Sequence, residues 1–465
     1  MRKTRRQRHK IPVEPIEITI QRLSHEGRGV ASIDGKIAFV DGALPGETVK
    51  ATFTSCRSQF DELKVEEILV PSVDRVDPPC THADICGGCS MQHISTAAQI
   101  ALKEHVLHEQ MKHIAGLSDY EHLPPMLGHT EGYRRKARLA ARFVSKKDEM
   151  LIGFREKNSS FIAQMGSCAV LVPDVSALIT PLRQLLATFA GRLQIPQIEV
   201  AVGEREPEDM GVIESESITQ YQVALIVRHL EDLVDEDKEK LLAFAEQYDI
   251  HLYMQPKGPD SVHKVWPQDN CDRLFYTLPE FGLRVAFHPS DFTQVNGDIN
   301  RRMISQALTL LDLQPEDVVL DLFCGLGNFT LPIATRCARV VGVEGSDEMV
   351  RRGTENAIAN SISNASFYSA NLCVDFDEST WAQPAYDKIL IDPPRSGAVE
   401  IIPRIAAFRA RKIVYISCNP ATLARDAGEL VKHGYVLKQA GIMDMFPHTG
   451  HVESIAEFIL AKTRH

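Results

Sequence analysis

The stretch Val318–Thr330, VVLDLFCGLGNFT, decides the fold. It begins as an apolar run interrupted only by Asp321 and continues into a turn that contains Gly325 and Gly327 before a helical pattern starts. Two glycines so close together allow a tight turn and a close approach of the backbone to a ligand. We therefore interpret the stretch as a buried strand that ends at a ligand-binding loop.

The same pattern repeats toward the end of the chain. Apolar runs alternate with helical ones, in the order RVVGVEG, SDEMVRRGTENAIA, ASFYSANL, YDKILIDPP, RKIVYISCNP and ATLARDAGELVKHG. Nearly continuous apolar strands are typical of a parallel sheet covered on both faces. The last stretch, Tyr435–Leu460, contains two strand-like runs and no helix between them, which predicts a closing antiparallel hairpin. The predicted fold class is α/β, with a Rossmann-like domain.

An acidic residue in this domain points to a ribose. Glu344 closes the second strand, 23 residues after Asp321, where a carboxylate can bind both ribose hydroxyls. The glycine loop lacks a complete G-x-G-x-x-G motif, so it offers no good pyrophosphate cradle, which argues against NAD or FAD. A cofactor with one ribose and no phosphate fits better, and S-adenosylmethionine (SAM) is the candidate. The alternative is a purely structural glycine turn.

Two residues end later strands. Asp392, in ILIDPPR, precedes two prolines that stiffen the loop, although it could be an ordinary turn residue. Cys418 ends the next strand, in VYISCNPATLARD, where Asn419 and Pro420 predict a turn with proline at the start of a helix. An isolated cysteine is more often inert packing. Its place at the functional end of a strand favours a nucleophile instead.

The chemistry that unites these groups is methylation of a pyrimidine carbon. Addition of a thiolate to C6 of uracil makes C5 enolate-like and able to attack a sulfonium methyl. A base must then remove the C5 proton so that the thiol can leave. Glu453, in HTGHVES on the predicted hairpin, suits that step, and His448 and His451 are rival bases or ordinary residues of a polar turn.

The N-terminal part has a different character. From Ile16 to Val70, short alternating runs between glycines and prolines predict a small barrel of the OB kind. The first ten residues carry six Lys/Arg, whereas the rest carries 45 basic against 62 acidic residues. This basic arm is either a contact with nucleic acid or a solvated tail. No apolar run is long enough to span a membrane, and we expect a cytoplasmic protein.

The middle of the chain is harder to interpret. An amphipathic helix is expected in AAQIALKEHVLHEQMKHIAG, with Ile100, Val106, Leu107, Met111 and Ile114 near one face. The basic run GYRRKARLAARFV follows it. On a strand, alternation divides the basic residues of that run, Arg138 among them, between two faces. They either contact RNA phosphates, with Tyr133 as a stacking ring, or form a solvated face.

Three cysteines are closely spaced in CTHADICGGCS: Cys80, Cys86 and Cys89. In a reducing compartment such a group points to a metal. Zinc would need a further ligand, such as His82 or His93, whereas an iron–sulfur cluster needs a fourth cysteine from elsewhere.

DLFCGLGNF, IDPPR, SCNP and HTGHVE, in this order, resemble the motifs of the uracil-C5 RNA methyltransferases. Amino-group methyltransferases share an Asp/Asn-Pro-Pro motif but have no cysteine nucleophile. The resemblance implies that Cys418 attacks uracil and that Glu453 is the base. It also implies a SAM pocket made of Gln294 (in DFTQVN), Phe323, Asn328, Glu344, Asn371 and Asp392.

The N-terminal part resembles a TRAM domain, an OB-like RNA-binding module. The family's cluster-bearing branch takes its fourth ligand from a later cysteine, which Cys168 in QMGSC matches. The resemblance therefore implies a [4Fe-4S] cluster on Cys80, Cys86, Cys89 and Cys168. A TRAM domain together with these cysteines resembles the branch that methylates 23S ribosomal RNA at uracil 1939. That RNA is the expected partner, contacted through Arg138, and a monomer without an obligatory protein partner is expected.

The implied domains are a basic tail (1–11), the TRAM barrel (12–72), a central α+β iron–sulfur domain (73–92 and 128–285) and the SAM-methyltransferase domain (93–127 and 286–465). Two other classes of function stay open. One is an amino-group methyltransferase that uses DPPR, and the other is a non-catalytic RNA-binding module.

Overall fold

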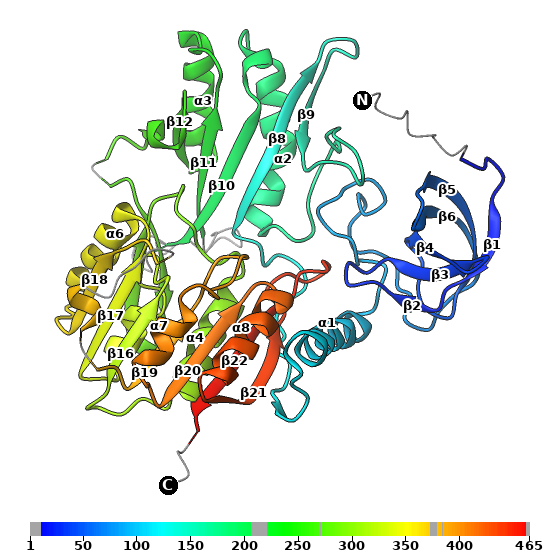
Figure 1. Cartoon of the computed structure of the whole chain (residues 1–465). Helices are drawn as coiled ribbons and strands as arrows, with labels where there is room; N and C mark the ends of the chain where they lie inside the picture. Colours follow the sequence, from blue (N-terminus) through cyan, green and yellow to red (C-terminus); the bar gives the residue numbers. More distant parts are fainter. Residues whose placement is uncertain (1–10, 206–220, 270, 373–378, 384, 462–465) are drawn as a thin grey trace, which may run out of the picture. The chain divides into compact units, whose positions relative to one another are not determined.

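The computed structural model describes residues 11–205, 221–269, 271–372, 379–383 and 385–461 (Figure 1). The chain forms two compact units. Unit 1 consists of the chain up to Asp84, Gly88–Val106 and His448–His451, and unit 2 consists of Ile85–Gly87, Leu107–Pro447 and the chain from Val452 onward. The basic tail lies outside the described residues except for residue 11. None of the described helices has the length and apolar character needed to cross a membrane.

Unit 1 contains a six-stranded sheet in the order β1-β5-β6-β4-β3-β2. Its strands are β1 (Ile16–Thr19), β2 (Arg22–Leu23), β3 (Gly29–Ile33), β4 (Lys36–Asp41), β5 (Thr48–Cys56) and β6 (Phe60–Val70). The sheet encloses a small core that includes Val40, Val49 and Leu63, each fully buried. Among the described strands, no ladder joins β1 to β2, so the predicted OB-like barrel is confirmed as a partly open one.

The predicted helix of the middle region is α1 (Thr96–Gln110), followed by a π-helical turn (Met111–Ala115). Leu107 and Met111 are fully buried, as the amphipathic pattern predicts. Ile114 was expected on the same face but is 47% exposed. The wider turn changes the 3.6-residue spacing, and Gly116 then ends the helix with a φ of 70°.

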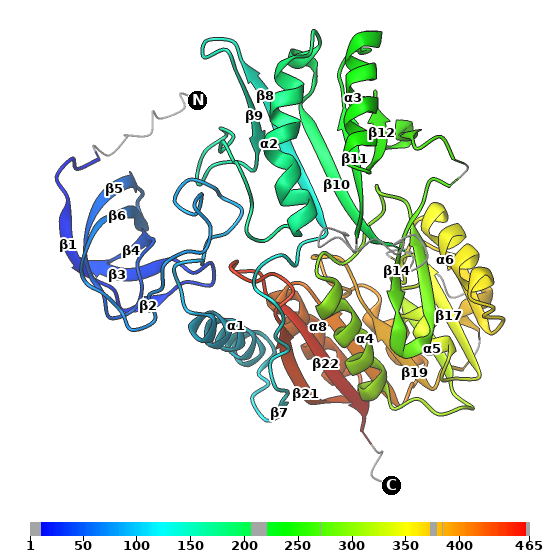
Figure 2. The same cartoon turned by 180° about the vertical axis from the view of Figure 1, so that it is seen from behind.

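The first sheet of unit 2 has six strands in the order β13-β12-β11-β10-β8-β9. They are β8 (Lys136–Val144), β9 (Glu149–Gly153), β10 (Gln197–Glu204), β11 (Tyr221–Arg228), β12 (His251–Gln255) and β13 (His263–Trp266). The helices α2 (Pro173–Ala187) and α3 (Asp235–Gln247) pack on it (Figure 2). This mixed sheet with its two helices is the predicted α+β region, and the exact domain limits stay a prediction.

The second sheet of unit 2 has eight strands in the order β18-β17-β16-β19-β20-β22-β21-β7. They are β7 (Glu121–His122), β16 (Val318–Leu322), β17 (Arg339–Glu344), β18 (Ala365–Ser369), β19 (Lys388–Ile391), β20 (Lys412–Ser417), β21 (Tyr435–Met443) and β22 (Glu453–Leu460). The five strands from β16 to β20 are parallel, and β21 and β22 form the predicted antiparallel hairpin. β22 lies between β20 and β21 in the sheet.

Helices cover both faces of this sheet, as its largely apolar parallel strands require. They are α4 (Gly297–Leu311), α5 (Thr330–Ala334), α6 (Asp347–Ala359), α7 (Ile402–Ala407) and α8 (Pro420–Lys432). α4 lies on one face and α8 on the other (Figures 1 and 2). The remaining short elements are the hairpin of β14 (Leu274–Leu278) and β15 (Leu283–Phe287) and single turns at Arg192–Gln194, Pro259–Ser261, Pro279–Phe281 and Thr380–Ala382.

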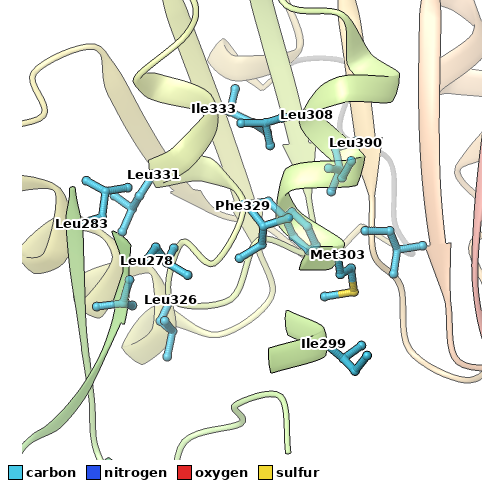
Figure 3. Close-up of a cluster of buried hydrophobic side chains, with 14 of the residues drawn as sticks. Leu278, Leu283, Ile299, Met303, Leu308, Leu326, Phe329, Leu331, Ile333 and Leu390 are labelled. Atoms are coloured by element: carbon cyan, nitrogen blue, oxygen red, sulfur yellow. The ribbon is translucent and has the colours of Figure 1, made fainter. Parts of the chain in front are cut away.

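The core of this region locks the glycine loop to its neighbours. Ile299, Met303 and Leu308 recur every four to five residues along α4 and point into the cluster in Figure 3. Leu326 and Phe329, from the loop after β16, are buried in the same cluster. The apolar side chains of VVLDLFCGLGNFT thus fix the position of the backbone that a ligand would approach.

Candidate functional site

Four parallel strands of unit 2 end at one edge of the sheet. Their register pairs Leu322 with Val343 and with Ile391, and Ile391 with Tyr415. Phe323, Glu344, Asp392 and Cys418 therefore lie at or just beyond the carboxyl ends of β16, β17, β19 and β20. In open α/β sheets this edge is where ligands bind.

The terminal hairpin brings a carboxylate to the cysteine. β22 pairs antiparallel with β20, with Ser454 opposite Ser417, and the Ser454 hydroxyl donates to the Ser417 carbonyl (3.3 Å). Cys418 directly follows Ser417 and Glu453 directly precedes Ser454, so both residues adjoin the last pair of this ladder, and the Glu453 carboxylate is close enough to act on the thiol. Sequence reasoning predicted a hairpin but not that its last strand would insert beside β20.

The Cys418 thiol is half-buried. Burial, with the nearby carboxylates of Glu453 and Asp392, raises its pKa to about 11, and the Arg395 guanidinium acts in the opposite direction. The thiol is therefore protonated at neutral pH in the ligand-free chain. Asn419 accepts a hydrogen bond from the Ala421 N–H (3.1 Å), so the predicted turn is confirmed as an N-cap of α8.

Hydrogen bonds join the glycine loop to the end of β17, where Glu344 lies. The N–H groups of Phe323 and Cys324 donate to the Val343 carbonyl (2.9 and 3.2 Å), and the Gly325 N–H donates to Glu344 Oε2 (3.1 Å). Phe323 has a φ of 62°, a left-handed conformation that a bulky residue rarely adopts. This strained backbone turns the loop back over the strand ends.

Two further carboxyls lie here, Asp321 fully buried and Asp392 half-buried. Asp321 is 0% exposed and accepts from the Thr330 hydroxyl (2.5 Å), and burial, aided by Asp392 and Glu344, raises its pKa to about 8. Burial alone raises the pKa of Asp392 to about 7. A bound cation would favour the ionised form of both. Sequence reasoning used Asp321 only as a reference point, although an acid inside an apolar strand was a signal.

Asn328 belongs to a network that the sequence does not reveal. It exchanges two hydrogen bonds with Asn300 of α4 (2.9 and 3.1 Å) and accepts one from the Tyr276 hydroxyl of β14 (2.7 Å). Gln294 is half-buried in the loop before α4, which the Arg135 N–H holds through the Val295 carbonyl (2.8 Å).

Asn371 is exposed and lies two residues beyond the carboxyl end of β18, a strand of the same sheet. All six residues that sequence analysis assigned to a cofactor thus lie in unit 2. Which of them contact a ligand stays a prediction.

The basic run divides as alternation requires. On β8, Ala137, Leu139 and Ala141 are buried, and Arg138 and Arg142 face outward. The Arg138 side chain is 72% exposed, and its Nε donates to Glu199 on β10 (2.9 Å). The stacking role that we considered for Tyr133 is wrong, because that ring is buried and its hydroxyl donates to the Pro447 carbonyl (3.2 Å).

His448 is also not the surface residue we considered. It is 5% exposed, its N–H donates to Gln99 Oε1 (2.9 Å), and its carbonyl accepts from the N–H of Met91 (2.9 Å). These partners belong to unit 1, as does His448 itself. His451 is exposed.

The four cysteines of the predicted cluster are shared by the two units. Cys80 and Cys89 belong to unit 1, and Cys86 and Cys168 to unit 2. In unit 2, Cys86 forms a bridge with Glu156, and the next N–H, of Gly87, donates to the Arg155 carbonyl (2.8 Å). Within the described ranges, no group of three or more His, Cys, Asp or Glu residues is arranged to hold a metal ion.

Comparison with known proteins gives two family matches. Residues 219–462 match the family described as tRNA (Uracil-5-)-methyltransferase, and residues 12–60 match the TRAM domain. The second match confirms the resemblance of the N-terminal part.

Related chains match over nearly their full length. The 23S rRNA (uracil(1939)-C(5))-methyltransferase RlmD of Alcanivorax borkumensis is 51% identical over 97% of this chain and 98% of its own. The proteins of the same name from Hahella chejuensis and Francisella tularensis subsp. novicida are 51% and 47% identical, each over 97% of this chain and 99% and 98% of their own.

A solved structure shares the fold. The Pyrococcus abyssi tRNA (uracil-54, C5)-methyltransferase, in complex with S-adenosyl-L-homocysteine, superposes with a TM-score of 0.70 at 22% identity, over 96% of this chain and 100% of that chain. The likeness confirms the predicted α/β architecture.

Proposed function

Because this chain belongs to the RNA uracil-C5-methyltransferase family, we propose that it methylates C5 of uracil 1939 in 23S ribosomal RNA, with SAM as the methyl donor. The observation that carries the proposal is the register of β20 and β22, whose last pair, Ser417 and Ser454, adjoins Cys418 and Glu453. A thiol and a carboxylate in this arrangement fit addition to uracil followed by removal of a proton.

The residues act in sequence on the base. The Cys418 thiolate forms a bond to C6 of a uracil that has left its stack, and the electron pair of the C5–C6 double bond moves toward C5 and the C4 carbonyl. SAM would supply the electrophilic methyl group: as the bond from C5 to the methyl carbon forms, the S–CH3 bond breaks, its electron pair stays on sulfur, and S-adenosylhomocysteine is the leaving group. Glu453 then removes the C5 proton, the C5–C6 double bond re-forms, and the bond from C6 to Cys418 Sγ breaks.

Several side chains would hold SAM. Glu344 is placed to accept from the ribose hydroxyls, since Gly325 N–H already orients its carboxylate. The raised pKa values of Asp392 and Asp321 suit a site that takes a cationic ligand. Gln294, Phe323, Asn328 and Asn371 complete the proposed pocket from neighbouring loops.

The target RNA and the location follow from the same proposal. The names of the relatives specify uracil 1939 of 23S rRNA. The TRAM domain and the exposed Arg138 guanidinium are the proposed RNA contacts, and the enzyme is proposed to act as a cytoplasmic monomer.

A test of the substrate uses transcripts of 23S rRNA that contain uridine 1939, with methyl-labelled SAM. We expect the label in 5-methyluridine at that position and about a hundredfold less on a transcript with cytidine there, because cytidine has the 4-amino group that a uracil site rejects. The measurement is nucleoside chromatography with position mapping. Label in an N-methylated nucleoside would favour an amino-group methyltransferase instead.

We further propose that Cys80, Cys86, Cys89 and Cys168 hold a [4Fe-4S] cluster. The support is the close spacing of the first three and the burial of Cys86, Cys89 and Cys168, at 6 to 9% exposed. Pairing of the Cys86 segment with Arg155 and Glu156, upstream of Cys168, adds to it. The donor set is chemically suited to iron and sulfide, and no step of the methyl transfer uses it.

Protein purified without oxygen should contain about four iron atoms per chain. Replacing any one of the four cysteines with serine should remove most of that iron, because each supplies a ligand. Cys271→Ser is the matched control, since Cys271 is exposed and outside the set. Iron and acid-labile sulfide are measured, and a zinc-containing, iron-free protein would refute the cluster.

A further inference from the structure

Asp426, a buried carboxylate on α8, joins three segments of unit 2. Its side chain is 0% exposed. Oδ2 accepts from the Tyr415 hydroxyl (2.6 Å) and from the Ala398 N–H (2.6 Å), and Oδ1 accepts from Arg425 Nε (2.8 Å). Tyr415 lies on β20, three residues before Cys418, and Ala398 lies in the loop between β19 and α7 that Asp392 begins. One carboxylate therefore ties the strand of the thiol to the loop of the acid.

The first turn of α8 holds the same loop at a second point. The Arg395 carbonyl accepts from Asn419 Nδ2 (3.3 Å) and from the Thr422 hydroxyl (3.3 Å). Asn419 directly follows Cys418 and caps α8 with its other side-chain atom. The residue that follows the thiol is thus hydrogen-bonded directly to the loop that begins at Asp392.

Gly397 shows how closely the loop lies on the helix. Its φ is 78°, and a Cβ built there would lie 2.5 Å from Arg425 Nη2 and 2.5 Å from Asp426 Oδ2. Arg425 Nη2 also donates to the Ser396 carbonyl (2.7 Å). A side chain at position 397 would not fit between the loop and the helix, so the close packing of the loop on α8 requires glycine there.

Each partner of Asp426 depends on its negative charge. Burial and the Asp426 carboxylate raise the pKa of the Tyr415 phenol, which keeps it a donor. Without the carboxylate, the buried Tyr415 hydroxyl and the Ala398 N–H would lose their acceptor. Arg425, which is 40% exposed, balances the charge.

We propose that Asp426 is a positioning residue for methyl transfer, which keeps the loop Asp392–Ala398 in register with Cys418. The inference rests on the proposed function, since it assumes that both Asp392 and Cys418 contact the reactants. Geometry matters at this scale, because a displacement of about 1 Å can slow a positioned reaction by roughly a hundredfold.

The test compares Asp426→Asn with a matched control, Asp317→Asn. Asp317 is equally buried and ion-paired, to Lys388 (2.7 Å) and Arg411 (2.6 Å), but it precedes β16 at the opposite edge of the sheet. Both variants should lose stability. With 5-fluorouridine RNA the covalent complex between Cys418 and the base accumulates, because fluorine cannot leave C5 as a proton does. The rate at which this complex forms is measured in a single turnover at saturating SAM. The rate is divided by the fraction of protein molecules that bind SAM, which calorimetry gives.

We expect Asp426→Asn to slow this rate by about a hundredfold and Asp317→Asn to keep it within about twofold. If Asp426→Asn does not fold, a second pair of variants, Tyr415→Phe and Tyr435→Phe, tests the same inference. Tyr415→Phe should slow the rate about tenfold. Tyr435→Phe, which removes an equally buried hydroxyl bonded to Ala410 (2.9 Å), should not.

Two outcomes would overturn the inference, and they differ in what else they affect. Equal rates within each pair, with a wild-type enzyme that forms the adduct, would sink the positioning role alone. A wild-type enzyme that forms no adduct would sink the proposed function, and the inference with it.

Discussion

Cys418→Ala should lose methyl transfer by roughly 10⁴-fold or more while still binding SAM. Without the thiol, nothing makes C5 of uracil nucleophilic enough to attack a sulfonium methyl. With 5-fluorouridine RNA, the wild-type enzyme should accumulate a covalent complex that denaturing gel electrophoresis detects, because fluorine cannot leave C5 as a proton does. The alanine variant should form none.

Cys337→Ala is the control for this experiment. Its thiol is also buried, with a pKa of about 11, but it lies just before β17 at the opposite edge of the sheet. It should form the complex at the wild-type rate. An alanine variant at 418 that still methylates uridine would refute the nucleophile and favour an amino-group methyltransferase.

The raised pKa of Cys418 also sets the direction of the pH dependence. Below a pKa of about 11, the thiolate fraction rises about tenfold per pH unit. The rate of complex formation should therefore increase as the pH rises from 6 to 9. Saturating SAM is needed, because Asp392 and Asp321 ionise over the same range.

Glu453→Gln should permit addition and methylation but stop the release of product. The amide cannot remove the C5 proton, so turnover should fall by roughly 10² to 10⁴-fold. In contrast to the wild type, a covalent complex should persist with ordinary uridine RNA. Loss of the carboxylate also lowers the pKa of Cys418, so the first addition should shift to lower pH.

His451→Ala provides the comparison, because His451 is exposed and two residues away. It should turn over normally. The measurement is the ratio of the steady-state turnover rate to the single-turnover methylation rate, which should collapse only in the Glu453 variant. Normal turnover by Glu453→Gln would mean that His451 or water removes the proton.

The parts of the site that the sequence predicted depend on local pattern. An apolar strand followed by a turn places its last residue at the sheet edge, so Glu344, Asp392 and Cys418 could be assigned to one edge from alternation alone. Glu453 could be assigned to a hairpin for the same reason.

Other features depend on contacts between distant segments. β22 lies between β20 and β21 in the sheet. The alternation of apolar and polar residues predicts which side chains share a face of a strand, but it does not predict which strands pair. The bonds of Asn328 to Asn300 and Tyr276 join three separate elements. The expectations for Tyr133 and His448 were wrong because both side chains combine a ring with a polar group. The sequence alone does not show whether such a ring is exposed or buried.

The placement of His448–His451 in unit 1, although β21 and β22 on either side belong to unit 2, has a consequence for how such proteins can be recombined. A barrel taken from a relative by cutting the gene at one point would arrive without the four residues that complete its own unit. Those residues lie far along the chain from the rest of unit 1, shortly before Glu453. Any successful exchange must carry both pieces, so the N-terminal unit and the segment leading to the proposed base are expected to be inherited together.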